Sequence, residues 1–272
     1  MRDLLRVIPV TRRGFFMSCG AALGTARIMA ATPTCALTPE QEQGPYYIDM
    51  GNLRVDLTEG KPGVPLKLRI ALVDAKDCAP LARAAVDIWH CDAAGVYSGF
   101  AAGGRGRGRG PGGPPPGGPP PEFGGQGFGP PPARISNEAR FLRGVQVTNA
   151  AGLVEFTTIY PGWYEGRTIH IHLKVHAGGH VSHTGQLFLP EEITEDVARL
   201  EPYARRTEVH RTMQAEDMVF RGQHGASSMM ALTRLQNGSN AGGFRAAATL
   251  AVNPEATPAP VGIGGRGPGR RG

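Results

Sequence analysis

The stretch from Arg167 to Lys174 reads Arg-Thr-Ile-His-Ile-His-Leu-Lys. In an extended strand successive side chains point to opposite faces, so His170 and His172 share one face. The residues that share the other face are Ile169, Ile171, Leu173 and Val175. The pattern predicts a strand with one face in a hydrophobic core and two imidazoles on the opposite face.

A His-x-His pair on a strand presents two imidazoles to one metal ion, but two ligands leave a site incomplete. Two half-exposed strand histidines with ordinary hydrogen bonds explain this pair alone equally well. Carboxylates are sparse, since only Glu165 is close in sequence, and the chain has no Cys-x-x-Cys. Two tyrosines do stand near strand-like runs, Tyr97 and Tyr164.

Tyrosine is a poor metal ligand at its ordinary pKa of about 10. Only a strong Lewis acid such as ferric iron would hold it as a phenolate near neutral pH. Two phenolates and two imidazoles would therefore select Fe(III) over Zn(II) or Mg(II). For each tyrosine alone, a buried ring with a hydrogen-bonded hydroxyl is the alternative.

Six blocks of sequence follow one another between about Thr38 and Val252. They read Gly44-Pro-Tyr-Tyr-Ile-Asp, Val86-Asp-Ile-Trp-His-Cys-Asp-Ala with Gly95-Val-Tyr-Ser-Gly, Phe141-Leu-Arg-Gly-Val-Gln, Phe156-Thr-Thr-Ile-Tyr-Pro-Gly-Trp-Tyr, Gly166-Arg-Thr-Ile-His-Ile-His, and Gln186-Leu-Phe. In these blocks the chain resembles the intradiol ring-cleavage dioxygenases, including their exported branch. The resemblance implies an all-β, prealbumin-like sandwich.

The resemblance also implies a set of site residues. Tyr97, Tyr164, His170 and His172 would ligate a non-haem ferric ion, and Arg167 and Gln186 would line the substrate side. Tyr164 would leave the metal and accept a proton, Arg167 would stabilise charge on the ring, and Gln186 would orient oxygen. The implied partners are a catechol-type substrate and O2, and the implied product is a muconate-type dicarboxylic acid. Homo-oligomerisation is left open.

Two of the chain's departures from the family pattern are local changes in sequence. Gln43 stands where the family usually has an acidic residue, and a Gly/Pro/Arg-rich insertion follows Tyr97, so the preferred ring substituent is left open. One alternative function is a secreted, transthyretin-like carrier without turnover. A zinc hydrolase built on His170 and His172 is a weaker alternative, because no third ligand of suitable spacing is evident.

Period-2 alternation predicts one antiparallel β-sandwich domain over residues 32–257. The expected strands and strand-forming runs are 66–72, 86–91, 153–159, 228–235 and 244–252, besides the strand with the histidine pair. Residues 149–152 form an expected tight turn, and 191–205 the one expected helix. The site would lie at the edge of the sandwich.

Residues 1–31 resemble a twin-arginine export signal. Thr11-Arg12-Arg13-Gly14-Phe15-Phe16 precedes an apolar stretch that is too short for a spanning helix of about 20 residues. We expect cleavage near Ala30 and Ala31, a periplasmic or extracellular enzyme, and no membrane attachment afterwards. An amphipathic N-terminal extension is the alternative.

Export to an oxidising compartment would allow disulfide formation. Cys19 lies in the expected signal, which leaves Cys35, Cys78 and Cys91, enough for at most one intramolecular disulfide. Cys78 falls near the turn of a presumed hairpin and Cys91 far along its second strand. A bond between these two is therefore not expected, and the pairing is left open.

The net charge of +6 lies mainly in terminal and low-complexity segments. Residues 1–31, 101–132 and 258–272 are all basic, and the remainder is near −3. This distribution argues against a nucleic-acid partner. The Gly/Pro/Arg composition of 101–132 and 258–272 predicts a mobile insertion and a disordered tail, because such segments cannot bury enough apolar surface to order themselves.

Overall fold

The computed structural model describes residues 35–49, 51–100, 133–235 and 242–262. The predicted signal and insertion, and residues 263–272 of the predicted tail, lie outside the described residues. The strands are β1 (Pro65–Asp74), β2 (Ala85–Trp89), β3 (Arg143–Val147), β4 (Leu153–Ile159), β5 (His170–Ala177), β6 (His180–Phe188), β7 (Ala231–Arg234) and β8 (Phe244–Val252). The helices are α1 (Glu191–Ala198) and α2 (Met218–Gly222), with short 3₁₀ turns at Tyr203–Arg205 and Gly225–Ser228.

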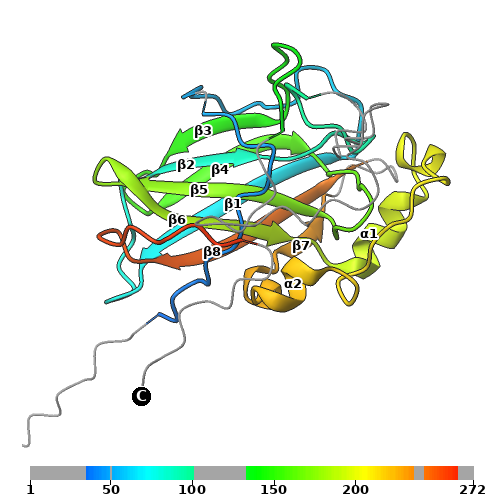
Figure 1. The fold of residues 1–272 in the computed structure, drawn as a ribbon. Helices are drawn as coiled ribbons and strands as arrows, with labels where there is room; N and C mark the ends of the chain where they lie inside the picture. The colour runs from blue at the N-terminus through cyan, green and yellow to red at the C-terminus, as the bar shows by residue number, and fades with distance from the viewer. Residues whose placement is uncertain (1–34, 50, 101–132, 236–241, 263–272) are drawn as a thin grey trace, which may run out of the picture. The chain divides into compact units, whose positions relative to one another are not determined.

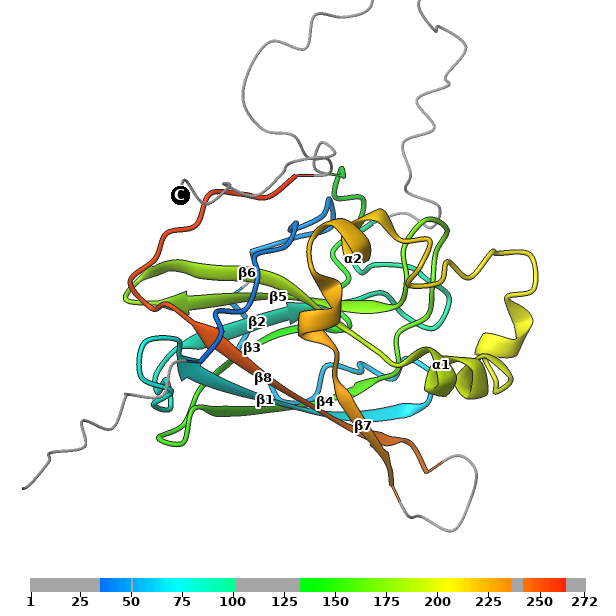
Figure 2. The same ribbon diagram turned by 90° about the horizontal axis from the view of Figure 1, so that it is seen from below.

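The strands form two four-stranded sheets that pack face to face (Figures 1 and 2). One sheet has the order β4-β1-β8-β7 and the other the order β3-β2-β5-β6. The predicted all-β sandwich is confirmed. One detail differs from the expected antiparallel pairing, because β1 and β8 run parallel.

The hydrophobic core lies between the sheets and follows the alternation seen in the sequence. On β1 the buried positions alternate with the outward-facing Lys67 and Arg69. From β5 the core receives Ile171, Leu173 and Val175. Burial of each such side chain contributes about 1.5–3 kcal/mol to folding, so the alternation fixes which face of each strand turns inward.

The second face of the β3-β2-β5-β6 sheet is also covered. Arg143, Trp89, His172 and Gln186 are direct neighbours across its four strands, so they form one row on this face. Segment 35–49 crosses the row, with the Gln41 N–H donating to the Thr184 carbonyl on β6. The predicted site therefore lies on the covered outer face of one sheet, rather than at the edge of the sandwich.

Some other expectations about elements were wrong, although α1 confirms the start of the expected helix. The helix expected over 191–205 ends at Ala198, because Pro202 cannot occupy a helix interior. A second helix, α2, was not expected. Strands β1 and β2 form no hairpin, since they lie in different sheets. Within the described parts of the chain, no helix combines the length and apolar character needed to cross a bilayer.

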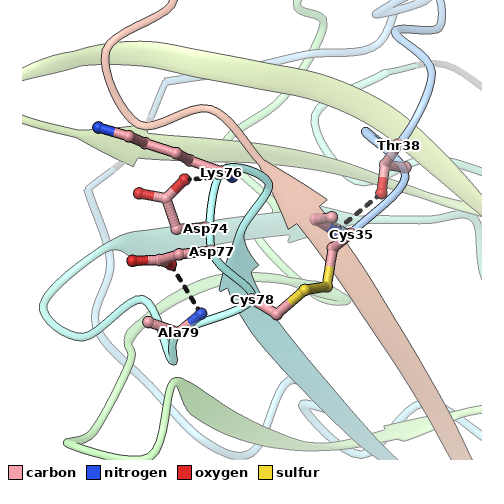
Figure 3. The surroundings of a disulfide bond; sticks show 8 residues. Cys35, Thr38, Asp74, Lys76, Asp77, Cys78 and Ala79 are labelled. Carbon is pink, nitrogen blue, oxygen red and sulfur yellow. Dashed lines mark hydrogen bonds between the residues drawn. A yellow bond between two sulfur atoms is a disulfide. The ribbon is translucent and has the colours of Figure 1, made fainter. Parts of the chain in front are cut away.

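A disulfide joins Cys35 to Cys78 (Figure 3). Cys91 is a buried free thiol. Cys78 lies in the turn after β1, where its backbone N–H donates to the Asp74 carbonyl. The bond ties the start of segment 35–49 to the sandwich. The sequence left this pairing open, because Cys35 precedes every recognisable strand.

Candidate metal centre and active site

Four side chains singled out by the sequence converge beside the outer face of the β3-β2-β5-β6 sheet. The Nε2 atoms of His170 and His172 lie 3.0 Å apart. The hydroxyl oxygen of Tyr164 lies 3.1 Å from His170 Nε2, and that of Tyr97 lies 3.4 Å from the same atom. The two hydroxyls are 3.5 Å apart. The structure thus brings together all four predicted metal ligands.

The ligand orientations follow from neighbouring groups. His170 Nδ1 lies 2.6 Å from the Thr168 carbonyl oxygen. A carbonyl can only accept, so Nδ1 carries the proton and the Nε2 lone pair faces the centre. The His172 ring stacks on Trp89 at 5.0 Å between centroids and 2° between planes. A Cβ added to Gly44 would lie 3.0 Å from His172 Cε1, so the segment before the Tyr-Tyr pair also contacts this ring closely.

Burial keeps all four side chains uncharged when no cation is present. It is the largest effect that lowers the pKa of His170, to about 3, and it lowers the pKa of His172 well below its ordinary value. Burial also raises the pKa of Tyr97 and Tyr164 far above the usual tyrosine value. The tyrosines can therefore become phenolates near neutral pH only beside a strong positive charge.

The donor set fits ferric iron. Donor atoms that share one first-row metal ion lie about as far apart as these four oxygens and nitrogens, since each bond is about 2.0–2.2 Å long. Without an ion, two imidazole nitrogens 3.0 Å apart need a proton between them. Among the described residues, no group of three or more His, Cys, Asp or Glu side chains could hold a metal ion. The tyrosines are thus essential to any site built on this histidine pair.

Two glycines let the tyrosine-bearing loops pack against each other. A Cβ on Gly95 would lie 2.3 Å from the Trp163 carbonyl oxygen, and Gly95 has a φ of +77°. A Cβ on Gly162 would lie 2.4 Å from the Ala93 carbonyl oxygen. The Gly162 N–H also donates to the Asp92 carbonyl at 3.1 Å. The glycines of the two sequence blocks therefore bring Tyr97 and Tyr164 together.

Arg167 lies beside the centre in a buried hydrogen-bond network. Its Nε donates to both carboxylate oxygens of Asp217, at 3.1 and 3.2 Å, and its Nη1 donates to Glu42 Oε1 at 3.3 Å. Its Nη2 donates to Gln186 Oε1. Gln186 Nε2 in turn donates to the Glu42 carbonyl at 2.9 Å. Arg167 is thus no surface ion pair, and both ends of the Gln186 amide have protein partners.

Two arginines that hold the tyrosine loops in place were not predicted from the sequence. Arg143 donates from Nε and Nη2 to Ser98, the residue after Tyr97, at 2.8 and 2.9 Å. Arg206 donates to the carbonyls of Ala94 and Trp163, one in each tyrosine loop. Only Arg143 had a sequence signal, because it lies within the block Phe141-Leu-Arg-Gly-Val-Gln.

The fold has counterparts among solved structures. An intradiol ring-cleavage dioxygenase from Tetranychus urticae is 32% identical, with a TM-score of 0.68 over 82% of this chain and 97% of that one. The chain belongs to the intradiol ring-cleavage dioxygenases. A second dioxygenase structure matches with 32% identity and a TM-score of 0.68 over 82% of this chain and 96% of that one.

More distant members share the fold alone. A catechol 1,2-dioxygenase from Acinetobacter radioresistens is 16% identical, with a TM-score of 0.52 over 82% of this chain and 64% of that one. No family model matches the sequence, and no curated protein does. The predicted family is confirmed by structural similarity, and the protein is an oxidoreductase of the dioxygenase class.

Proposed function

We propose that this dioxygenase uses non-haem Fe(III) to cleave catechol-type rings between the two hydroxyl-bearing carbons, giving muconate-type dicarboxylic acids. The observation that carries the proposal is the convergence of two phenol oxygens and two imidazole nitrogens within 3.0–3.5 Å. Bound ferric iron would supply the Lewis acidity that stabilises a catechol dianion and the electron affinity that opens its ring to O2.

The two tyrosines would play different parts. Tyr97 is only 3% exposed, whereas Tyr164 is partly exposed. Tyr97 would remain a ligand throughout, together with His170 and His172. The Tyr164 oxygen would accept a proton from an incoming catechol hydroxyl.

Arg167 would stabilise negative charge that develops on the ring, through charge-assisted hydrogen bonds. The contacts of Gln186 favour a different part from the predicted one of orienting oxygen. The Gln186 amide oxygen accepts from Arg167 and its amide nitrogen donates to the Glu42 carbonyl. These contacts suit Gln186 to orienting the Arg167 guanidinium.

The carrier alternative is set aside because the chain belongs to a family of enzymes. The purified protein tests the rest of the proposal. We expect about one iron per chain, a red-brown colour from phenolate-to-iron charge transfer, and O2 consumption with catechols that yields a dicarboxylic acid. A colourless protein that binds no iron and consumes no O2 with any catechol would contradict it.

We also propose that the enzyme is exported. The twin-arginine pattern of residues 1–31 and the Cys35–Cys78 disulfide support this, because disulfides persist in oxidising compartments. Mass spectrometry of the protein from cell fractions tests it. We expect a chain that begins near Thr32, found outside the cytoplasm and containing one free thiol. A full-length cytoplasmic chain would contradict export.

A further inference from the structure

Asp217 is a fully buried carboxylate far from the site residues in sequence. Its two oxygens accept from the Arg167 Nε and from the backbone N–H groups of Thr168, Val219 and Phe220. We propose that Asp217 is a positioning residue that sets Arg167 and the ligand His170 together. The inference rests on the proposed function, because it deepens the assignment of the same site.

The first path runs through the Arg167 side chain. A free arginine samples many rotamers, and ordering it costs up to about 2 kcal/mol. Here the side chain is 12% exposed and that of Asp217 is 0% exposed. Both oxygens of Asp217 accept from Nε, and the side chains of Glu42 and Gln186 accept from Nη1 and Nη2 respectively. Since Nε is the guanidinium nitrogen closest to the backbone, Asp217 fixes the direction in which the guanidinium leaves the chain.

The second path runs through the backbone to the metal ligand. Asp217 Oδ2 accepts from the Thr168 N–H at 2.9 Å, and the Thr168 carbonyl accepts from His170 Nδ1 at 2.6 Å. The peptide planes at Thr168 are thus held on both sides. A group that fixes the second nitrogen of a ligating histidine fixes its tautomer and the direction of its lone pair.

A role limited to helix capping does not account for these contacts. Asp217 Oδ1 caps α2 by accepting from Val219 and Phe220 at 2.7 and 3.2 Å. The N-cap acceptor needs no charge and no second oxygen, since serine, threonine and asparagine also serve there. The other oxygen of Asp217 is directed at Arg167 and Thr168. Glu42, the other carboxylate that contacts Arg167, uses only one of its oxygens, because its Oε2 has no hydrogen-bond partner among the described residues.

The test is a double-mutant cycle in the full-length, iron-loaded protein. It compares wild type, Asp217→Asn, Arg167→Leu and the double variant, with catechol as substrate. Asparagine retains the capping oxygen but loses the negative charge and the second acceptor. Thr148→Val is the matched control, because Thr148 is buried and makes two hydrogen bonds away from the site, to Ala84 and Leu81 just before β2.

We expect Asp217→Asn to lower kcat about 10- to 100-fold, as loss of an outer partner of a metal or catalytic site typically does. The double variant should lose less than the product of the two single losses, because both changes disturb the path through Arg167 and only Asp217→Asn disturbs the path through Thr168. The resting charge-transfer band should move in Asp217→Asn, and it should also differ between the double variant and Arg167→Leu, since Asp217 reaches His170 through Thr168 without the Arg167 side chain. Thr148→Val should keep the wild-type kcat and band.

Three results would overturn the inference: a wild-type kcat in Asp217→Asn, losses that multiply in the double variant, or an unmoved band. If Asp217→Asn does not fold, Asp217→Glu keeps the charge but displaces both oxygens by one methylene, and a wild-type kcat there overturns the inference equally. If wild type consumes no O2 with catechols, the proposed function fails by itself. The cycle is then measured on thermal unfolding, where additive effects of the two changes would show that Asp217 and Arg167 are not coupled.

Discussion

At the scale of single residues, the two tyrosines show how position divides the work of identical side chains. Tyr97 is buried, and Arg143 holds the following residue, Ser98, by two hydrogen bonds. Tyr164 is partly exposed and lies three residues before Arg167, whose side chain donates to Gln186. The fully buried residue is suited to permanent ligation, and the partly exposed one is suited to exchange with substrate.

Substitutions at the ligands should therefore differ in outcome. We expect Tyr97→Phe and His172→Ala each to abolish stoichiometric iron binding or the charge-transfer band, because each removes a buried donor. Tyr164→Phe should lose turnover by about 100-fold or more but retain some iron, since three donors remain. Metal analysis and visible absorption of the purified variants measure both effects. Full iron and unchanged colour in Tyr97→Phe and His172→Ala would show that the ligand assignment is wrong.

Asp87 gives the fold a pH dependence that is separate from the metal ligands. Burial is the largest effect that raises its pKa, to about 7. The charged or titratable groups that face it are Tyr47, Asp49, Arg143 and Lys174. Because its pKa is higher in the folded than in the unfolded chain, protonation favours folding. The stability that the protonated carboxyl contributes is full below about pH 4 and is lost as the pH rises towards 7.

Asp87→Asn should remove this dependence. Asparagine stays neutral and can still accept from the Tyr47 hydroxyl, so the variant should gain stability relative to wild type as the pH rises. We expect the ratio of the two unfolding equilibrium constants to change by about tenfold or more between about pH 4.5 and pH 8. Urea unfolding at both pH values measures this ratio. Parallel pH dependence of the two proteins would show that Asp87 does not titrate in this range.

The residues differ in how far their parts could be predicted from sequence. The histidine pair was recognisable because a period of two residues fixes which side chains share a face. Glu42 and Asp217 were not, because they meet Arg167 from 125 and 50 residues away in the chain. Gln43 stood out as a departure from the family pattern, while its neighbour Glu42 makes the carboxylate contact with Arg167. No local pattern reports such a contact.

At the scale of elements, the site depends on close packing between two loops. The loop with Tyr97 follows β2, and the loop with Tyr164 precedes β5, which pairs with β2 in the same sheet. The hydrogen bond from the Gly162 N–H to the Asp92 carbonyl joins the loops. Since each loop carries one phenol, the distance between the phenols is set by this backbone contact.

Gly162→Ala should therefore disturb the centre without touching a ligand. The new Cβ would lie 2.4 Å from the Ala93 carbonyl oxygen and 2.6 Å from that of Asp92, so the loops must separate. We expect lower iron occupancy and a Tm lower by several degrees, because overpacking typically costs about 1–3 kcal/mol. Differential scanning fluorimetry and metal analysis measure both.

Gly222→Ala is the matched control for this prediction. A Cβ at Gly222 meets nothing within 4 Å, and the position lies in α2, where alanine is favoured by about 0.5–1 kcal/mol. We expect an unchanged or slightly higher Tm and wild-type iron content. Equal behaviour of the two alanine variants would show that the contact between the loops does not position the phenols.

Elements were more predictable than their pairing. Alternation located β1 and β4 nearly to the residue, because burial on one face leaves a period of two in the sequence. The parallel pairing of β1 with β8 leaves no such trace, since the two strands are far apart in the chain. The same holds for the division of β1 and β2 between two sheets.

At the scale of the whole molecule, segment 35–49 links the parts of the site. The disulfide at Cys35 and the Thr38 N–H, which donates to the Ala251 carbonyl, hold its start on the sandwich. Further along, Glu42 contacts Arg167, and the Tyr46 ring stacks on Tyr97 at 4.4 Å. A covalent bond at one end of the segment thus helps to order the residues that meet the ligands at the other.

The Gly/Pro/Arg-rich insertion can be tested at this scale, although residues 101–132 lie outside those described. The residues that flank the insertion lie close together, because the Ser136 N–H donates to the Gly99 carbonyl at 2.7 Å. The Ala133 N–H donates to the Pro45 carbonyl at 3.0 Å, so the returning chain also contacts segment 35–49. A short linker can therefore join Phe100 to Ala133 without moving either end.

Replacing residues 101–132 by a linker of about six Gly and Ser residues should preserve the Tm within a few degrees and leave iron content unchanged. Loop-closure entropy changes by only about 0.6 kcal/mol for each halving of loop length, and in the direction of greater stability. In a contrasting variant the same linker runs from Phe100 to Asn137, so the residues whose N–H groups donate to Gly99 and Pro45 are replaced by unanchored Gly and Ser residues, and both quantities should fall. Calorimetry and metal analysis distinguish the two variants. If the first replacement already fails to fold or to bind iron, the insertion is part of the folded domain, and the prediction of a mobile insertion from its Gly/Pro/Arg composition is wrong.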